Sequence, residues 1–231
     1  MDRNRSQAVA APSMHVAFGK TGIADVPSTH PSPWRTPIMS DVDEPEVARA
    51  AYIDPTARLF GDLRLGEGAS IWPHAVLRAE MHHIRIGPLT NVQDHVMIHI
   101  GYRHAVDIGS YCSIAHHSTL HGCTIGDNCL IGIHTTIMDG CVIGENSIVG
   151  GHSFLTENTI IPPNSIVMGA PGKIRRSQDC SVENIANALL YELNARAYAR
   201  GHHRAWADAD FAKIQRQARE IAMARQAIPG G

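Results

Sequence analysis

An aliphatic residue returns at every sixth position through the middle of the chain, and this period restricts the fold more than any other feature of the sequence. Eight such residues stand in unbroken register: Ile125, Ile131, Ile137, Ile143, Val149, Leu155, Ile161 and Val167. The same spacing recurs upstream in three shorter runs, over residues 53–77, 86–98 and 108–120. A period of six fits neither an amphipathic helix nor an alternating strand. It is typical of parallel β-helices built from hexapeptides.

Three hexapeptides make one coil of 18 residues, with each aliphatic residue pointing into the coil. Glycine follows several of them, as in Ile125-Gly126 and Ile143-Gly144, which suits corners that need permissive backbone angles. We therefore predict a mainly β chain, with a parallel β-helix over residues 46–176. Residues 1–45, which are rich in proline and lack a hydrophobic period, predict an extended or disordered N-terminal arm.

Residues 177–231 predict a C-terminal helical segment. Apolar residues recur there at helical spacing in two groups: Val182, Ile185, Leu189 and Leu193, and then Ala207, Phe211, Ile214, Ala218 and Ile221. The break between the two groups falls near Gly201-His202-His203. We expect both helices to pack on the coil or on a neighbouring subunit.

The five cysteines suggest core packing more than a disulfide framework. Cys112, Cys129 and Cys141 each fall four places after an inward aliphatic residue, where the repeat otherwise takes small side chains. The count is odd and no Cys-x-x-Cys occurs, as expected of a reducing compartment. Cys123 and Cys180 are not assigned by the repeat.

The repeat also predicts which histidines stack. The step from Ile98 to Ile108 is ten residues, so a four-residue loop interrupts the period there. His99 and His121 each follow an inward residue of one face and are 22 positions apart, which is one coil plus that loop. Stacked rungs lie about 4.8 Å apart, and two nitrogens on one tetrahedral zinc lie roughly 3.4 Å apart. Converging imidazoles could therefore share a metal ion.

Three other polar residues take related places. Arg78 occupies the same slot as His99 one coil earlier, and Asp94 and His116 stack on the preceding face. His117 should point in a different direction from His116, toward solvent. His134 and His152 are one coil apart in a shared slot.

Five segments together resemble a known family: Leu77-Arg78-Ala79-Glu80, Asn91-Val92-Gln93-Asp94, Ile98-His99, Ile114-Ala115-His116 and the run 120–126. This pattern resembles the γ-class carbonic anhydrase family of hexapeptide-repeat proteins, over residues from about 55 to about 176. The resemblance implies a left-handed β-helix and a homotrimer with metal sites between subunits. His99 and His121 would come from one chain and His116 from its neighbour.

The resemblance also implies the chemistry of the site. The metal would be Zn²⁺, with Fe²⁺ or Co²⁺ as alternatives, because imidazole discriminates weakly among them. Arg78 and Glu80 would correspond to the family's pair at the trimer interface, and Gln93 and Asp94 to residues beside the metal. The implied reaction is that of a lyase: metal-bound hydroxide, oriented by Gln93, attacks carbon dioxide and gives bicarbonate.

Two glutamates that transfer protons in the family's best-studied enzymes have no counterpart. Met81 and a short loop with Tyr102 and Arg103 occupy those places, so we expect weak or buffer-dependent hydration. Nearby histidines are candidate substitutes as proton shuttles: His82, His83 and His104, which we expect on the two loops beside the site, and His134. Three alternatives remain open, namely hydrolysis of acyl-CoA thioesters at the same metal, acyl transfer with a histidine base, and a non-catalytic trimeric scaffold.

Composition excludes little else. The net charge is −2 and no block of Lys and Arg occurs, so nothing favours a nucleic-acid partner. No apolar run reaches the roughly 20 residues of a membrane span, and no apolar signal segment follows the first residues. We expect a cytoplasmic protein that acts on a small-molecule substrate.

Overall fold

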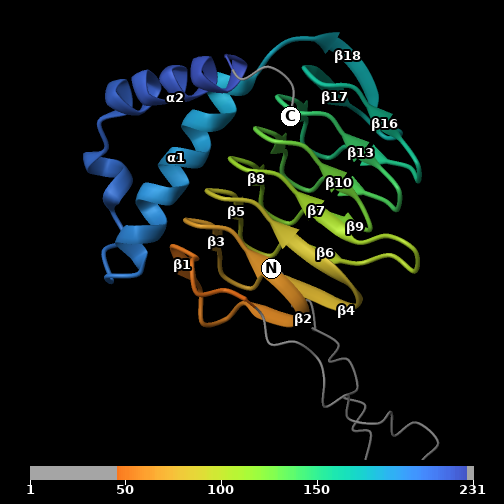
Figure 1. Cartoon of the computed structure of the whole chain (residues 1–231), viewed down its shortest axis with the longest axis horizontal. Coiled ribbons are helices and arrows are strands. Elements are labelled where there is room, and N and C mark those ends of the chain that lie inside the picture. Colours follow the sequence, from red (N-terminus) through yellow and green to blue (C-terminus); the bar gives the residue numbers. More distant parts are fainter. Residues whose placement is uncertain (1–45, 228–231) are drawn as a thin grey trace, which may run out of the picture. The chain divides into compact units, whose positions relative to one another are not determined.

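The computed structural model describes residues 46–227, in which the chain winds into a parallel β-helix accompanied by two α-helices (Figure 1). The fold class predicted from the sequence, a left-handed parallel β-helix followed by C-terminal helices, is confirmed. The arm predicted for residues 1–45 lies outside the described residues.

The strands stack in three columns. The first column is an eight-stranded sheet in the order β1 (Tyr52–Ile53), β3 (Ser70–Ile71), β5 (Asn91–Val92), β8 (Ser113–Ile114), β11 (Leu130–Ile131), β14 (Ile148–Val149), β17 (Ser165–Met168) and β18 (Lys173–Ser177). The second contains β2 (Arg58–Leu65), β4 (Val76–Ile86), β6 (Met97–His99), β9 (Thr119–His121), β12 (Thr136–Ile137) and β15 (Phe154–Leu155). The third contains β7 (Val106–Ile108), β10 (Thr124–Ile125), β13 (Val142–Ile143) and β16 (Ile160–Ile161), and the bent strands β2 and β4 join it to the second. Among these strands all pairings are parallel except that of β17 with β18.

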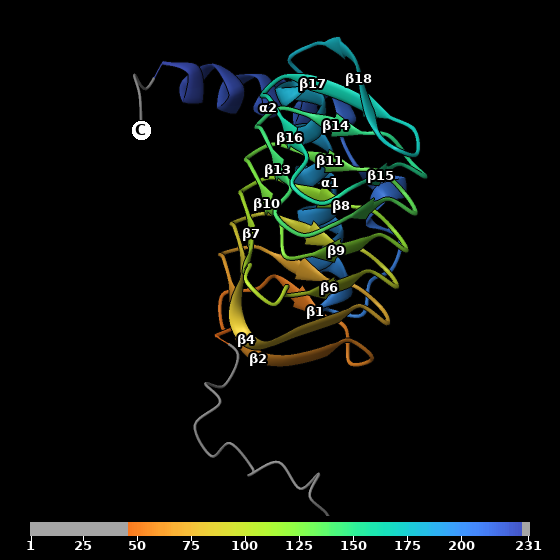
Figure 2. The same cartoon turned by 90° about the vertical axis from the view of Figure 1, so that its right-hand side faces the viewer.

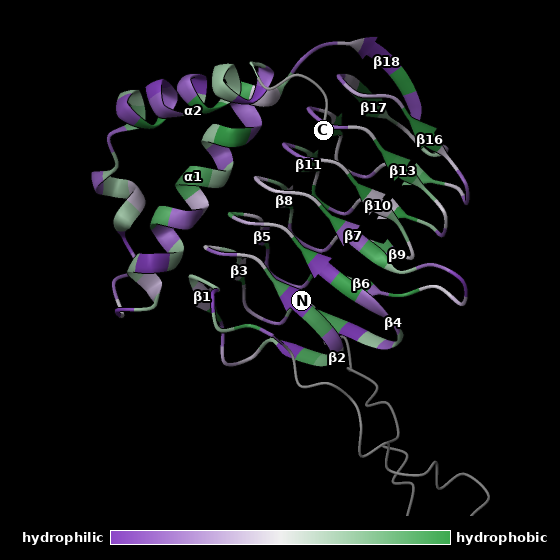
Figure 3. Ribbon diagram, viewed as in Figure 1, coloured by the Kyte–Doolittle hydropathy of each residue, from purple (hydrophilic) through white to green (hydrophobic). Residues whose placement is uncertain are grey.

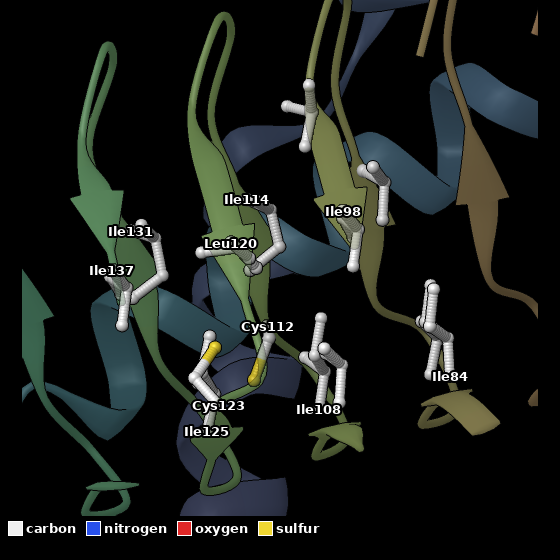
Figure 4. Packing of buried hydrophobic residues seen from close by; sticks show 14 of the residues in the cluster. Ile84, Ile98, Ile108, Cys112, Ile114, Leu120, Cys123, Ile125, Ile131 and Ile137 are labelled. Atoms are coloured by element: carbon white, nitrogen blue, oxygen red, sulfur yellow. The ribbon is translucent and has the colours of Figure 1, made fainter. Parts of the chain in front are cut away.

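The register places the predicted aliphatic residues one above another inside the coil. Leu77 pairs with Ile98, Ile98 with Leu120, and Leu120 with Ile137. All the inward positions are buried except Ile53 and Leu59 of the first coil, which are partly buried and pack against the core. Figure 4 shows these side chains filling the interior.

All five cysteines are free and buried, so the prediction of core packing is confirmed for Cys112, Cys129 and Cys141. Figure 4 shows Cys112 and Cys123 among the inward isoleucines. Burial raises the pKa of both thiols well above its ordinary value.

All three corners of the coil place residues other than glycine at positive φ, where Asn and His are favoured over most residues, and two of the corners do so repeatedly. Between the third and first columns, Asn128, Asn146 and Asn164 occupy this position with φ of 55–59°. The amide of Asn128 donates to Asn146 over 2.9 Å, and that of Asn146 to Asn164 over 3.1 Å. Between the first and second columns, the same turn position is occupied by histidines.

Helix α1 (Ser181–Tyr198) lies along the first column, against β1, β3, β5 and β8. Its Asn184 side chain donates to the carbonyls of Asn128 and Ser147, and Asn187 donates to the hydroxyl of Ser113. Figure 3 shows hydrophilic residues interspersed with hydrophobic ones on both α-helices.

The second predicted helix begins later than expected. Ala207 lies in a short 3₁₀ helix, η1 (Ala205–Asp208), and α2 (Phe211–Gln226) starts after an extended residue, Ala209. The side chain of Asp210 caps α2 by accepting from the backbone N–H of Lys213, which fixes the new start. Figure 2 shows the C-terminal part of α2 extending beyond the coil. Neither α-helix of residues 46–227 has the length and apolar character required to cross a bilayer.

Candidate metal centre

The second column brings together Arg78, His99 and His121, which stand in register on β4, β6 and β9. The stacking predicted from their spacing is therefore observed. The imidazoles of His99 and His121 tilt by 60° to each other, and Nδ1 of His99 lies 3.1 Å from Nε2 of His121. Two nitrogens sharing a tetrahedral zinc lie about 3.4 Å apart. The pair fits two ligand positions of such a metal with only a small adjustment.

Each of these imidazoles is held by a carboxylate at its other nitrogen. Nε2 of His99 lies 3.1 Å from Glu80, and Nδ1 of His121 lies 2.7 Å from Asp139. If each of these nitrogens donates its hydrogen to the carboxylate, the two facing nitrogens both present lone pairs. Facing lone pairs repel, so a bound cation or a proton between them would stabilise the arrangement. Carboxylates in this place orient metal-ligating histidines in proteins generally.

Arg78 completes the group around His99 by forming an ion pair with Glu80. Partial burial alone would raise the pKa of Glu80, but its backbone hydrogen bond and the contact with Arg78 outweigh burial and lower it. Glu80 therefore stays ionised and remains an acceptor for His99.

His116 lies elsewhere in the chain, at the corner that follows β8 of the first column. Its Nδ1 is 2.9 Å from Asp94, as expected from their stacked positions, and its side chain is partly exposed. The contact with Asp94 leaves Nε2 of His116 for another partner. All three candidate ligands therefore have a carboxylate partner. Within residues 46–227 of one chain, no group of three or more His, Cys, Asp or Glu side chains is arranged to hold a metal ion.

Gln93 is buried on the first column, where its side-chain amide donates to Asn91 over 2.9 Å. The structure thus places Gln93 and Asp94 with His116, and Arg78 and Glu80 with His99 and His121. The predicted site residues form two separate groups in one chain, one around His116 and one around His99 and His121.

Asp139 was missed by the sequence analysis. It follows β12 at the corner one coil beyond His121, two places after the inward Ile137. The coil from Leu120 to Ile137 spans 17 residues instead of 18, so counting in register from His121 reaches Met138 and misses Asp139. Asp139 is less exposed than the other two carboxylates, with 22% of its side chain accessible against 43% for Glu80 and 36% for Asp94.

The candidate shuttles are placed differently from one another. His82 and His83 were expected on a loop, but both lie within β4 because this strand continues around the corner to the third column. His83 is bound to Asp107 at 3.1 and 3.2 Å, whereas the imidazole of His82 contacts the Tyr102 carbonyl at 3.3 Å. His104 remains near the centre, with Nδ1 3.9 Å from Asp139.

Comparisons with known proteins agree with this architecture. The family model described as bacterial transferase hexapeptide (six repeats) matches residues 122–157. Over 147 residues the chain is 42% identical to a Methanocaldococcus jannaschii protein named probable carbonic anhydrase, a match that covers 63% of this chain and 92% of that protein. It is also 37% identical over 101 residues to gamma carbonic anhydrase 1, mitochondrial, of Arabidopsis thaliana; the match spans 41% of this chain but only 37% of the plant protein's length.

Among solved structures, the crystal structure of a hexapeptide transferase family protein from Anaplasma phagocytophilum matches with a TM-score of 0.58 and 34% identity. This match covers 67% of the chain and 89% of that structure. The fold and the match over 92% of the length of the Methanocaldococcus jannaschii relative define the class of protein. The chain belongs to the γ-class carbonic anhydrase-like family of hexapeptide-repeat proteins.

Proposed function

We propose that this protein is a metal-dependent enzyme of the γ-class carbonic anhydrase type, which hydrates carbon dioxide to bicarbonate. The observation that carries the proposal is the pair of imidazole nitrogens of His99 and His121, 3.1 Å apart, with a carboxylate behind each ring. The name of the archaeal relative, probable carbonic anhydrase, supports the same reaction.

The proposed enzyme is a homotrimer with one metal per chain. His99 and His121 of one chain and His116 of a neighbouring chain would bind Zn²⁺, with Fe²⁺ and Co²⁺ as other ions that imidazole accepts. The two groups of site residues in a chain would be the two halves of this shared site. In each group a carboxylate holds an imidazole at one ring nitrogen, and the other ring nitrogen does not contact a carboxylate. A closed C3 ring would use both half-sites of every chain.

A zinc ion bound by three histidines lowers the pKa of a water ligand to about 7, which makes a nucleophile available for carbon dioxide at neutral pH. The chain's own residues supply orientation: Glu80, Asp94 and Asp139 fix the three imidazoles. Gln93, next to Asp94, would orient the nucleophile from the His116 half-site.

Removal of the product proton would limit the rate. Met81 and Tyr102 are 60% and 78% exposed where the family's glutamates would stand, and neither offers a carboxylate to carry the proton. Beside His121, the half-buried His104 also approaches Asp139, with Nδ1 at 3.9 Å. Hydration of carbon dioxide should therefore be slow in buffers that do not accept a proton near neutral pH, and faster with added imidazole.

The test combines metal analysis with stopped-flow hydration on protein prepared anaerobically and reconstituted with Zn²⁺, Fe²⁺ or Co²⁺. We expect one metal per chain and hydration that imidazole buffer accelerates. His104→Gln should leave the imidazole-rescued rate intact while slowing the rate without imidazole. A protein that binds stoichiometric metal but hydrates no carbon dioxide in any buffer would contradict the proposed reaction.

The hexapeptide transferase relative supports a second candidate, acyl transfer, in which a histidine would act as base. A metal-bound histidine cannot accept a proton in that role, so the two candidates exclude each other at this site. Metal-free protein that binds coenzyme A would favour acyl transfer. Metal-dependent turnover of one acyl-CoA thioester, without hydration, would favour thioester hydrolysis.

A further inference from the structure

A second set of histidines runs along the corner between the first and second columns. They stand one coil apart and all are exposed: His74, His95, His117, His134 and His152. Their ring centroids follow at steps of 4.9, 4.7, 4.7 and 5.0 Å, and adjacent planes differ by only 5–23°. We name this set the histidine ladder. The sequence analysis had singled out only His134 and His152 as a shared slot.

The backbone does not require imidazole at this corner. Each ladder residue has φ between 56 and 61°, which Asn adopts at least as readily as His. At the corresponding corner between the third and first columns, Asn128, Asn146 and Asn164 adopt φ of 55–59°. Since Asn serves the same turn in the same molecule, the five histidines call for an explanation in the chemistry of the side chain.

The ring nitrogens of the ladder are available to a ligand. Across residues 46–227 the side-chain hydrogen bonds and ion pairs include none made by these five imidazoles, in contrast to the asparagines, which bond to one another. Exposed neutral imidazole is a good ligand for borderline divalent ions such as Ni²⁺, Cu²⁺ and Zn²⁺.

The spacing of the rungs also suits a metal. His99 and His121 show what two histidines on successive rungs can do: with centroids 5.1 Å apart and planes tilted by 60°, their nearest nitrogens come within 3.1 Å. The ladder imidazoles are no farther apart, so a comparable rotation of exposed side chains would bring their nitrogens to the spacing of two metal ligands.

We propose that the histidine ladder is a second metal-binding site, separate from His99, His116 and His121, that takes Ni²⁺, Cu²⁺ or Zn²⁺ between imidazoles of adjacent rungs. Two histidines would bind each ion, with water completing its coordination. Five rungs provide at most two such pairs.

The test uses untagged full-length protein and Ni²⁺ as the probe. A quadruple variant, His74→Asn/His95→Asn/His134→Asn/His152→Asn, leaves His117 isolated and keeps a residue suited to positive φ at every rung. The matched control is His202→Asn/His203→Asn, which removes two exposed histidines outside the ladder. Calorimetric titration measures Ni²⁺ per chain, and retention on immobilised Ni²⁺ provides an independent readout.

We expect the wild type and the control each to bind at least one Ni²⁺ per chain more than the quadruple variant, which should also elute at lower imidazole. The count is a difference between variants, so it does not depend on whether the proposed carbonic anhydrase site binds metal. If circular dichroism shows that the quadruple variant is unfolded, His134→Asn/His152→Asn decides, with a partial loss expected. Unchanged Ni²⁺ binding by a folded ladder variant, or no excess in the wild type, would overturn the proposal.

Discussion

At the scale of single residues, the candidate centre depends on carboxylates as much as on histidines. Glu80, Asp94 and Asp139 each contact one imidazole, and only Asp139 does so from a corner one coil beyond its histidine. It accepts from His121 over 2.7 Å, and its Oδ1 is the nearest atom to a Cβ built on Gly101 or Gly122. Larger side chains at those two glycines would displace it.

We expect Asp139→Asn to weaken metal binding by about 10- to 100-fold, because an amide accepts less strongly and lacks the charge that orients His121. Competition with a chromophoric chelator measures the affinity. Asp107→Asn is the matched control, since Asp107 also holds a histidine, His83, outside the centre. Equal affinities for the two variants would show that Asp139 does not position a ligand.

Counting along the repeat predicted the stacking of His99 with His121 and of Asp94 with His116, because the coil converts sequence distance directly into height. The same arithmetic did not reveal the role of Asp139, since a carboxylate at a corner has no distinctive period. It also misplaced His82 and His83, because β4 bends around a corner that was expected to be a loop.

At the scale of the elements, the corner between the third and first columns combines a backbone requirement with a row of hydrogen bonds between asparagine side chains. Asn146 stands in the middle, with φ of 59° and bonds to both Asn128 and Asn164. The chain of amides begins at Asn128, whose Oδ1 is buried without a partner within the described residues; the turn one coil earlier holds Tyr111, which has no amide to donate.

Asn146→Gly and Asn146→Ala separate the two contributions. Both remove the amide bonds, which we expect to cost about 1–3 kcal/mol in the free energy of unfolding. Only Ala adds the penalty of a Cβ at positive φ, about 1 kcal/mol more. In urea unfolding followed by circular dichroism, the midpoint concentration should be highest for the wild type, lower for Asn146→Gly and lowest for Asn146→Ala. Equal midpoints for the two variants would contradict the backbone argument.

Helix α1 is joined to the first coils by an aromatic cluster. The ring centroid of Trp72 lies 5.6 Å from that of Tyr191 and 5.0 Å from that of Tyr198, and both pairs pack edge to face. Helical spacing predicted that α1 exists. It could not predict the contact between α1 and Trp72, because residues that are distant in the sequence but adjacent in the fold do not affect the local spacing of apolar residues.

Burial, with a smaller contribution from the Asp94 charge, raises the pKa of Tyr191 to about 12. The unfolded value is about 10, so the stability that neutral Tyr191 provides is complete below pH 10 and is lost as the pH rises through 12. We expect an alkaline transition in tryptophan fluorescence within this window. Tyr191→Phe should move the midpoint of this transition to higher pH, whereas Tyr102→Phe, at an exposed position, should leave the midpoint unchanged.

At the scale of the whole molecule, the proposed shared metal site requires neighbouring chains to meet. Besides the candidate ligands His99 and His121, the second column carries apolar outward side chains, such as Met97 and the 38% exposed Phe154. Such residues are suited to an interface between copies of the chain.

Subunit complementation tests the assembly. His99→Ala and His116→Ala should each abolish metal binding, but trimers co-assembled from equal amounts of the two variants should recover about a quarter of the wild-type metal, because random neighbours then restore one site in four. Elemental analysis of the co-expressed, purified trimer measures this recovery. Light scattering that shows a monomer at micromolar concentration, or mixtures without metal, would contradict the shared site.

The contact of α1 with the first coil has a consequence for synthesis. Each coil pairs with the one before it, so the β-helix can grow rung by rung as the chain leaves the ribosome. Tyr52, however, packs against Tyr198, whose ring centroid lies 5.8 Å away. The aromatic surface made first therefore waits for the end of α1, which is synthesised after all the coils, and until α1 emerges it is an exposed surface on which a chaperone, or another nascent chain, could bind.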